Sequence, residues 1–222
     1  MNIENNLNTK YMKNAIYMRI PRCGSSSMAG LCKKFKNIKV FGGRDMGFWG
    51  CDTILEKNTS LKLYECILNH VGEKVYNESF VFTTVRNPYS RAVSMFKHQS
   101  WDRWSGRKQD SVVKNSKTFR DFCMAIKNNN FPNDAAKWHS GTLTDHMVDG
   151  NDLKVDFAIK LENFQEDFNI VCDKIGIPKE QLPHARKGKH KHYTEYYDEE
   201  TKQIVAEKYA KDIEYFGYKY GE

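Results

Sequence analysis

The sequence lacks long apolar runs and paired cysteines, and both absences narrow the class of protein. No stretch approaches the roughly 18 consecutive apolar residues of a membrane-spanning helix, and the opening residues MNIENNLNTKYMKN do not form a signal peptide. The six cysteines form no CxxC pair and have no metal-ligand spacing with histidine. We therefore expect a soluble protein of the reducing cytoplasm, without a metal site.

Length and composition indicate one globular domain. The chain has 222 residues, of which 40% are hydrophobic and 13% aromatic, and it contains no internal repeat. We expect a single domain over residues 1–222, with residues 1–13 mobile or forming an edge element. The net charge of +7 indicates an anionic partner, which charge alone leaves open among nucleic acid, a membrane surface and small phosphorylated or sulfated molecules.

Apolar patterns predict an α/β fold. Strands are expected at residues 15–20, 39–41, 80–85 and 155–161, and one-sided helices at 28–35, 60–71, 88–96, 119–126, 164–175 and from 198 onward. Residues 98–117 and 129–152 show no clear period; the first is either a functional loop or a surface insertion. Alternating strands and helices favour a mostly parallel sheet covered on both faces, with ligands bound at the carboxyl ends of the strands.

The stretch from Ala15 to Phe35 predicts a strand, a tight polar turn and a helix. Its turn, RCGSSS, would present backbone N–H groups, hydroxyls and a positive helix end to one phosphate or sulfate. A serine-rich turn that only caps a helix is the alternative. A nucleoside triphosphate P-loop fits badly, because Gly24 and Gly30 are one residue too far apart and the cation, Arg22, precedes the glycine.

A second motif follows the strand FVFTTV and reads RNPYSRAVS. Asn87 is a suitable helix N-cap and Pro88 a suitable first helical residue. One helical face is apolar, formed by Tyr89, Ala92, Val93 and Phe96. Ser94 lies off that face, about 9 Å along the helix from Pro88, a span that an extended arginine largely covers. Arg86 and Ser94 can therefore share one phosphate.

These two motifs resemble those of the sulfotransferases that use 3′-phosphoadenosine 5′-phosphosulfate (PAPS), in particular the carbohydrate-type branch. PRCGSSSM is similar to the family's 5′-phosphosulfate loop, and VRNPYSRAVS to its 3′-phosphate motif. Weaker resemblance continues through VDFAIKLENF and YYDEETKQIVAEKYAKDIEYFGY. The resemblance implies a three-layer α/β fold with a P-loop-like turn, and transfer of a sulfuryl group from PAPS to a hydroxyl, with a saccharide as the expected acceptor and no metal.

The resemblance also assigns the donor-binding residues. Those for the 5′-phosphosulfate are Arg22, Cys23, Gly24, Ser25, Ser26 and Ser27; those for the 3′-phosphate are Arg86 and Ser94, with Arg186, Lys187 and Gly188 similar to an RKG element that closes over it. A solvated charge run is the alternative for the last three residues. Arg22 replaces the lysine usual in the family; it keeps the charge that stabilises the leaving oxygen but cannot pass on a proton.

The general base and the source are less clearly indicated. Asp45 is the preferred base, with His70 and His139 as the other candidates. Eukaryotic members of this branch are typically anchored in the Golgi membrane, so the missing anchor suggests a microbial or viral source or a shortened chain. Two other functions stay open: a nucleotide-binding module without catalysis, and a basic nucleic-acid-binding protein, although the cations are mostly scattered rather than clustered on one element.

Overall fold

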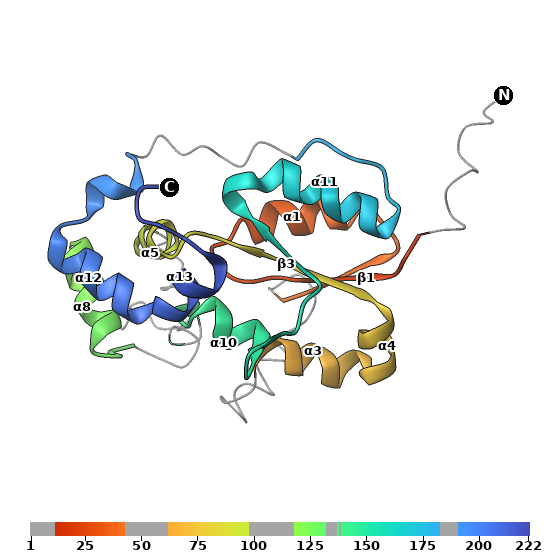
Figure 1. Cartoon of the computed structure of the whole chain (residues 1–222), viewed down its shortest axis with the longest axis horizontal. Coiled ribbons are helices and arrows are strands. Elements are labelled where there is room, and N and C mark those ends of the chain that lie inside the picture. The colour runs from red at the N-terminus through yellow and green to blue at the C-terminus, as the bar shows by residue number, and fades with distance from the viewer. Residues whose placement is uncertain (1–11, 43–61, 98–117, 132–136, 138, 183–190) are drawn as a thin grey trace, which may run out of the picture. The chain divides into compact units, whose positions relative to one another are not determined.

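The computed structural model describes residues 12–42, 62–97, 118–131, 137, 139–182 and 191–222 (Figure 1). The chain divides into two compact units, and each is described by itself. The first unit takes residues up to 85 and 147–186, and the second takes 86–146 and 187–222. Of the sequence predictions, the loop at 98–117, the base Asp45 and the residues Arg186, Lys187 and Gly188 lie outside the described residues.

The first unit contains a four-stranded parallel sheet, as the alternating pattern predicts. Its strands, in the order β2-β1-β3-β6, are β2 Ile38–Phe41, β1 Ala15–Met18, β3 Phe80–Val85 and β6 Phe157–Lys160. All residues of β1 and β3 are buried. Burial along the whole strand is expected for central strands of a parallel sheet, because both faces are covered.

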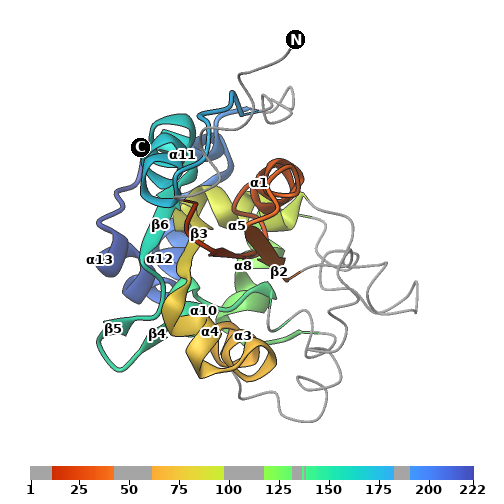
Figure 2. The ribbon, with the colours of Figure 1, turned by 90° about the vertical axis from the view of Figure 1, so that its right-hand side faces the viewer.

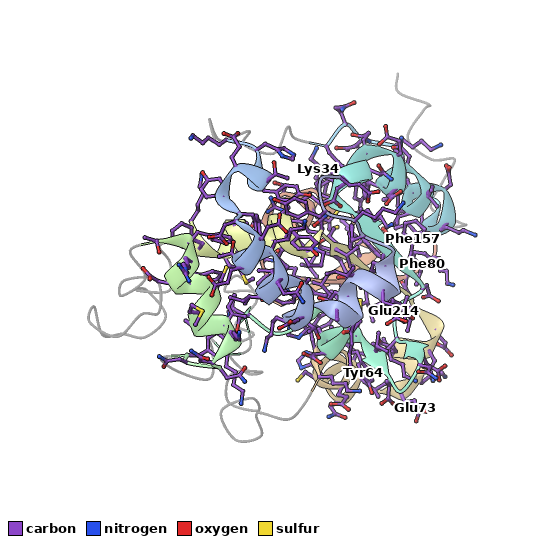
Figure 3. The ribbon with its side chains drawn as sticks, turned by 60° about the vertical axis from the view of Figure 1, so that its left-hand side comes forward. Lys34, Tyr64, Glu73, Phe80, Phe157 and Glu214 are labelled. Atoms are coloured by element: carbon purple, nitrogen blue, oxygen red, sulfur yellow. The ribbon has the colours of Figure 1, made fainter. Side chains whose placement is uncertain are left out.

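Helices cover both faces of this sheet (Figure 2). Helices α1, Ser25–Cys32, and α11, Phe164–Ile175, lie on one face, and α3, Leu63–Val71, and α4, Glu73–Glu78, lie on the other. Side chains of α1 and α11 pack with those of the strands in one apolar core, against which the partly buried Phe157 packs beside Phe80 (Figure 3). The predicted three-layer arrangement is confirmed for this unit.

The strand order places a topological switch at β1. Strand β2 follows β1 in the chain and lies on one side of it, whereas β3 lies on the other side. Since the strands are parallel, their carboxyl ends share one edge of the sheet, where doubly wound folds bind ligands. The polar turn follows β1 at this edge, and Val85, the last residue of β3, is followed in the chain by Arg86.

The second unit is helical. Its elements are α5 Pro88–Phe96, α8 Phe119–Lys127, α10 Leu143–Met147, the 3₁₀ turn η4 Tyr193–Tyr196, α12 Glu199–Lys208 and α13 Ala210–Phe216. Its core combines aromatic side chains from α5, α8 and η4 with the aliphatic Ile204 and Val205 of α12. Side chains cap two of these helices: Thr118 accepts a hydrogen bond from Asp121 N at the start of α8, and Asp198 accepts one from Thr201 N at the start of α12.

Two sequence predictions are wrong. The sequence predicts a single helix from residue 198, but the structure has two helices that meet at Tyr209. The prediction fails because the helical spacing of apolar residues continues across the break. Residues 129–152, expected to be irregular, contain α10 and an antiparallel hairpin of β4, Val148–Asp149, with β5, Asp152–Leu153. Strands of two residues are too short to give an alternating pattern.

Buried polar side chains hold the chain before α10. Arg91 on α5 is 1% exposed, and its guanidinium donates to the carbonyl oxygens of Gly141 at 2.8 Å and His139 at 3.0 Å. The ring of Tyr209 lies 5.9 Å from this guanidinium, and its hydroxyl donates to the Ser140 carbonyl at 2.9 Å. Three consecutive carbonyl groups are thus satisfied by two buried side chains, as buried backbone groups require.

Asp212 caps α10 from the other end of the sequence. Its carboxylate accepts hydrogen bonds from Leu143 N at 2.7 Å and Thr144 N at 2.9 Å. Burial raises the pKa of Asp212, while these two N–H groups and the Arg91 guanidinium oppose that rise. The break at Tyr209 begins α13, the helix that carries Asp212. Asp212 thus adds a long-range cap to the start of α10, beside the local one in which Thr142 and Asp145 exchange hydrogen bonds of 3.0 Å.

Candidate functional site

The turn after β1 has an unusual backbone conformation. Arg22 has φ of 68° and Gly24 has φ of 72°, both in the left-handed region. A non-glycine residue there is uncommon and often marks a functional site. Gly24 is also closely packed, since a Cβ atom added to it would lie 2.6 Å from Cδ1 of Leu161 and would displace that side chain. The chain thus reverses tightly enough to begin α1 directly after the turn.

The three serines form the first turn of α1. Ser27 and Met28 donate their N–H groups to the Gly24 carbonyl at 3.1 and 3.3 Å, so the helix begins earlier than its first apolar residue suggested. The N–H groups of Ser25 and Ser26 precede these and, as in every helix, have no acceptor within it. The Ser25 side chain is buried, whereas that of Ser26 is exposed. The helix start therefore presents N–H groups and hydroxyls together.

A cation that the sequence analysis missed lies beside these serines. The Nη2 atom of Arg19, which directly follows β1, lies 3.4 Å from Ser26 Oγ and donates to it. Its own backbone N–H donates to the Phe41 carbonyl at 2.8 Å, which continues the pairing of β1 with β2. The signal in the sequence was a cation within an apolar strand. Cys23 is buried in the turn, and its thiol donates to the Pro21 carbonyl at 3.6 Å.

The second motif forms the start of α5, as predicted. The Asn87 side chain accepts a hydrogen bond from Tyr89 N at 3.0 Å and donates one to the Lys219 carbonyl at 2.8 Å. Arg86 donates through Nε to Ser90 Oγ at 2.9 Å. Ser94 is half-buried one helical turn beyond Ser90. The sequence analysis missed Ser90, although a spacing of four residues links positions 86, 90 and 94.

Two of the three candidate bases belong to the described residues, and they lie in different units. His70 is exposed in the last turn of α3, and its ring centroid lies 5.7 Å from that of Phe41. His139 is half-buried, and its carbonyl group accepts a hydrogen bond from Arg91. His70 therefore belongs to the unit that contains the polar turn, and His139 to the unit that contains α5.

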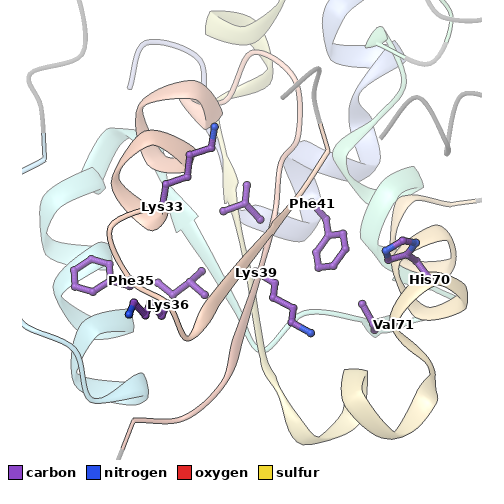
Figure 4. Close-up of a pocket in the computed structure, with 9 residues that line it drawn as sticks. Lys33, Phe35, Lys36, Lys39, Phe41, His70 and Val71 are labelled. Atoms are coloured by element: carbon purple, nitrogen blue, oxygen red, sulfur yellow. The ribbon is translucent and has the colours of Figure 1, made fainter. Parts of the chain in front are cut away.

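A hollow of about 680 Å³ lies along the edge strand β2 (Figure 4). It is lined by Lys33, Phe35, Lys36, Ile38, Lys39, Val40, Phe41, His70 and Val71. Three of these nine side chains are lysines and none is acidic, so the hollow favours an anionic or polar ligand. Phe41 pairs in register with Met18, so the end of the hollow near His70 lies at the same sheet edge as the polar turn.

The cysteines of the described residues act as small apolar side chains. They are Cys23, Cys32, Cys66, Cys123 and Cys172, and all are buried. Burial raises the pKa of Cys123 to about 12 and that of Cys172 to about 11, so these two thiols stay protonated at neutral pH. Within the described ranges, no group of three or more His, Cys, Asp or Glu side chains could hold a metal ion, and no helix is long and apolar enough to span a membrane.

Comparison with known proteins identifies one family. The model of a family described as "Sulfotransferase family" matches residues 5–219, almost the whole chain. No curated protein and no solved structure matches the chain. The match covers both units and includes the polar turn, α5 and the last two helices.

Proposed function

Because the chain belongs to the Sulfotransferase family, the carbohydrate sulfotransferases that use PAPS as donor, we propose that it transfers the sulfuryl group of PAPS to a saccharide hydroxyl. The observation that carries this proposal is the turn at residues 22–24, where two left-handed residues lead directly into α1. Backbone N–H groups at a helix start and in such turns favour an oxyanion.

The residues of this turn fit the 5′-phosphosulfate of PAPS. Arg22 supplies positive charge, and Ser25, Ser26 and Ser27 supply hydroxyls and N–H groups at the positive end of the α1 dipole. Cys23 contributes its backbone, since its side chain is buried. Gly24 leaves no side chain between the turn and Leu161. The group that would bind here is compact and doubly charged, as a phosphosulfate is.

The start of α5 fits the 3′-phosphate. Arg86 and Ser94 are proposed to bind it, with Arg186, Lys187 and Gly188 as a further element. Support comes from the first unit, in which β1 and β3 are paired parallel neighbours: one leads into the polar turn, and Arg86 is the next residue after the other. Motifs that start at the carboxyl ends of neighbouring strands are the usual basis of a nucleotide site in α/β folds.

Bound PAPS supplies an activated sulfuryl group whose leaving oxygen belongs to a phosphate. By analogy with phosphoryl transfer, the protein holds the acceptor in line and stabilises the charge on that oxygen, which is the role proposed for Arg22. A general base removes the acceptor's proton. Asp45, His70 and His139 are the proposed bases; of the two that the structure describes, His70 lies at a hollow with aromatic rings and lysines where a saccharide can bind.

Ligand-dependent melting tests the donor assignment. At about 100 times its dissociation constant, a ligand of the native state adds roughly 2.7 kcal/mol, or about 5–11 °C for a chain of this size. We expect such a shift with adenosine 3′,5′-bisphosphate, a smaller one with ATP, and loss of the difference in Arg86→Ala. A larger shift with ATP would contradict the proposal. Transfer of labelled sulfate to saccharide acceptors then separates an enzyme from a binding module that lacks catalysis.

A further inference from the structure

We propose that Ser90 is a positioning residue for the donor's 3′-phosphate: it holds Arg86 by its Nε atom, so that the two terminal nitrogens of the guanidinium approach one phosphate together. The inference rests on the proposed function and adds to it a residue outside the Arg86 and Ser94 pair. Its basis is the hydrogen bond of 2.9 Å from Arg86 Nε to Ser90 Oγ, between two partly buried side chains of the second unit.

The chemistry of arginine gives this contact its meaning. The guanidinium has one donor on Nε and four on its two terminal nitrogens, and the terminal pair forms the fork that matches two phosphate oxygens. A long arginine side chain samples many rotamers, and each one that is excluded before binding lowers the entropy lost on binding. A bond to Nε orients the plane of the fork without using its terminal donors. Ser90 thereby selects the rotamers in which the fork can meet a phosphate.

The helix that carries Ser90 is a fixed support. Ser90 and Ser94 are four residues apart and so lie on the same face of α5, while Ala92 and Val93 are buried on another face. The first turn of α5 is capped by Asn87, whose amide also donates to the Lys219 carbonyl. One turn of the helix is thus anchored to the last residues of the described chain, so Ser90 Oγ has a defined position relative to Arg86.

The expected consequence is selectivity for nucleotides with a 3′-phosphate. If Ser90 acts through Arg86, removal of the Ser90 hydroxyl lowers the affinity only for a ligand that Arg86 contacts. A residue that merely stabilises the fold would instead change the affinity for every nucleotide alike. Adenosine 3′,5′-bisphosphate and adenosine 5′-monophosphate differ only by the 3′-phosphate, so the ratio of their dissociation constants isolates this effect.

A double-mutant cycle tests the proposal, with dissociation constants for both nucleotides measured by titration calorimetry on the full chain. One hydrogen bond of ordinary strength corresponds to about 2- to 10-fold in affinity. We expect Ser90→Ala to lower the affinity for the bisphosphate by about that factor and the affinity for the monophosphate by less than about twofold. Ser90→Thr keeps the hydroxyl and should restore selectivity. Arg86→Ala should remove the preference for the bisphosphate. Adding Ser90→Ala to Arg86→Ala should then leave both dissociation constants unchanged.

The outcomes separate this inference from the proposed function. Equal weakening of both nucleotides by Ser90→Ala, or an added loss in the Arg86→Ala background, overturns the positioning role and leaves the donor assignment intact. Retention of full selectivity in Arg86→Ala overturns the assignment of the 3′-phosphate itself, and the inference falls with it. Melting curves recorded without ligand show whether each variant is folded, so a loss of binding through unfolding is recognised directly.

Discussion

The polar turn after β1 and the helix α5 are the two regions proposed to bind the donor, and they are built differently. The turn depends on backbone conformation, with left-handed φ values at Arg22 and Gly24 and close packing of Gly24 on Leu161. Helix α5 has regular backbone and depends on side-chain hydrogen bonds, among them those of Asn87 and Arg91. The turn should therefore be sensitive to the size of a side chain, and α5 to the loss of a polar group.

The largest loss of stability is expected where α5 depends on a buried charge. In Arg91→Met the carbonyl groups of His139 and Gly141 lose their donors, and Asp212 loses a nearby cation. Removal of one member of a buried ionic network costs about 3–5 kcal/mol. The midpoint of thermal unfolding should fall by about 6–20 °C.

Arg120→Met is the matched control for this change. Arg120 also lies on a helix of the second unit and forms an ion pair with Glu200, but its side chain is 60% exposed. Exposed ion pairs contribute about 0–1 kcal/mol, so the midpoint should change by less than about 4 °C. Equal shifts of the unfolding midpoint in the two variants would show that burial does not determine how much Arg91 contributes to stability. The contrast between α5 and the turn would then have no basis.

A smaller loss is expected in the turn, from a single methyl group. Gly24→Ala forces a left-handed conformation on alanine and brings Cβ to 2.6 Å from Leu161. Strain of about 1–2 kcal/mol and overpacking of about 1–3 kcal/mol together predict a loss of roughly 2–5 kcal/mol, or about 4–20 °C. Binding of adenosine 3′,5′-bisphosphate should weaken in the same variant, because alanine favours a different backbone conformation at residue 24 and so displaces the turn.

The neighbouring glycine provides the control. Gly30 is exposed within α1, and a Cβ atom added there has no atom within 4 Å. Gly30→Ala should stabilise the helix by about 0.5–1 kcal/mol, because alanine loses less backbone freedom on folding. If Gly24→Ala also melted at or above the wild-type temperature, the left-handed turn and its packing on Leu161 would be refuted.

The same contrast explains how much of the molecule the sequence could predict. The strand, turn and helix at 15–35 and the cap at Asn87 follow from local patterns, and both are confirmed. The burial of Arg91 could not be predicted, because its partners are backbone carbonyls 48 and 50 residues away along the chain. The break at Tyr209 was hidden by apolar spacing that continues through it. Long-range polar contacts leave no periodic signal.

The candidate site shows the same division. Residue types and motif spacing indicated an anion-binding turn, yet the left-handed conformation of Arg22 has no signature in a residue that usually avoids it. Arg19 and Ser90 were missed, because their importance comes from Ser26 and Arg86, the side chains that they contact. The motifs identify the residues proposed to meet the donor, and the structure adds the residues that hold them.

A substitution at Arg22 distinguishes the role of its backbone conformation from the role of its charge. It is expected to change stability least, and to raise it rather than lower it. Glycine accepts the left-handed conformation without strain. The free energy of unfolding of Arg22→Gly should therefore lie within about 1 kcal/mol of the wild-type value or slightly above it. Its rate of sulfate transfer should nevertheless fall by about 10²- to 10³-fold, because the charge proposed to stabilise the leaving oxygen is gone. Arg22→Lys restores a cation and should recover most of that rate, measured with labelled PAPS at saturation. An unchanged rate of sulfate transfer in Arg22→Gly would show that the turn acts through its backbone alone. The turn would then bind the donor by backbone N–H groups, and α5 by side chains.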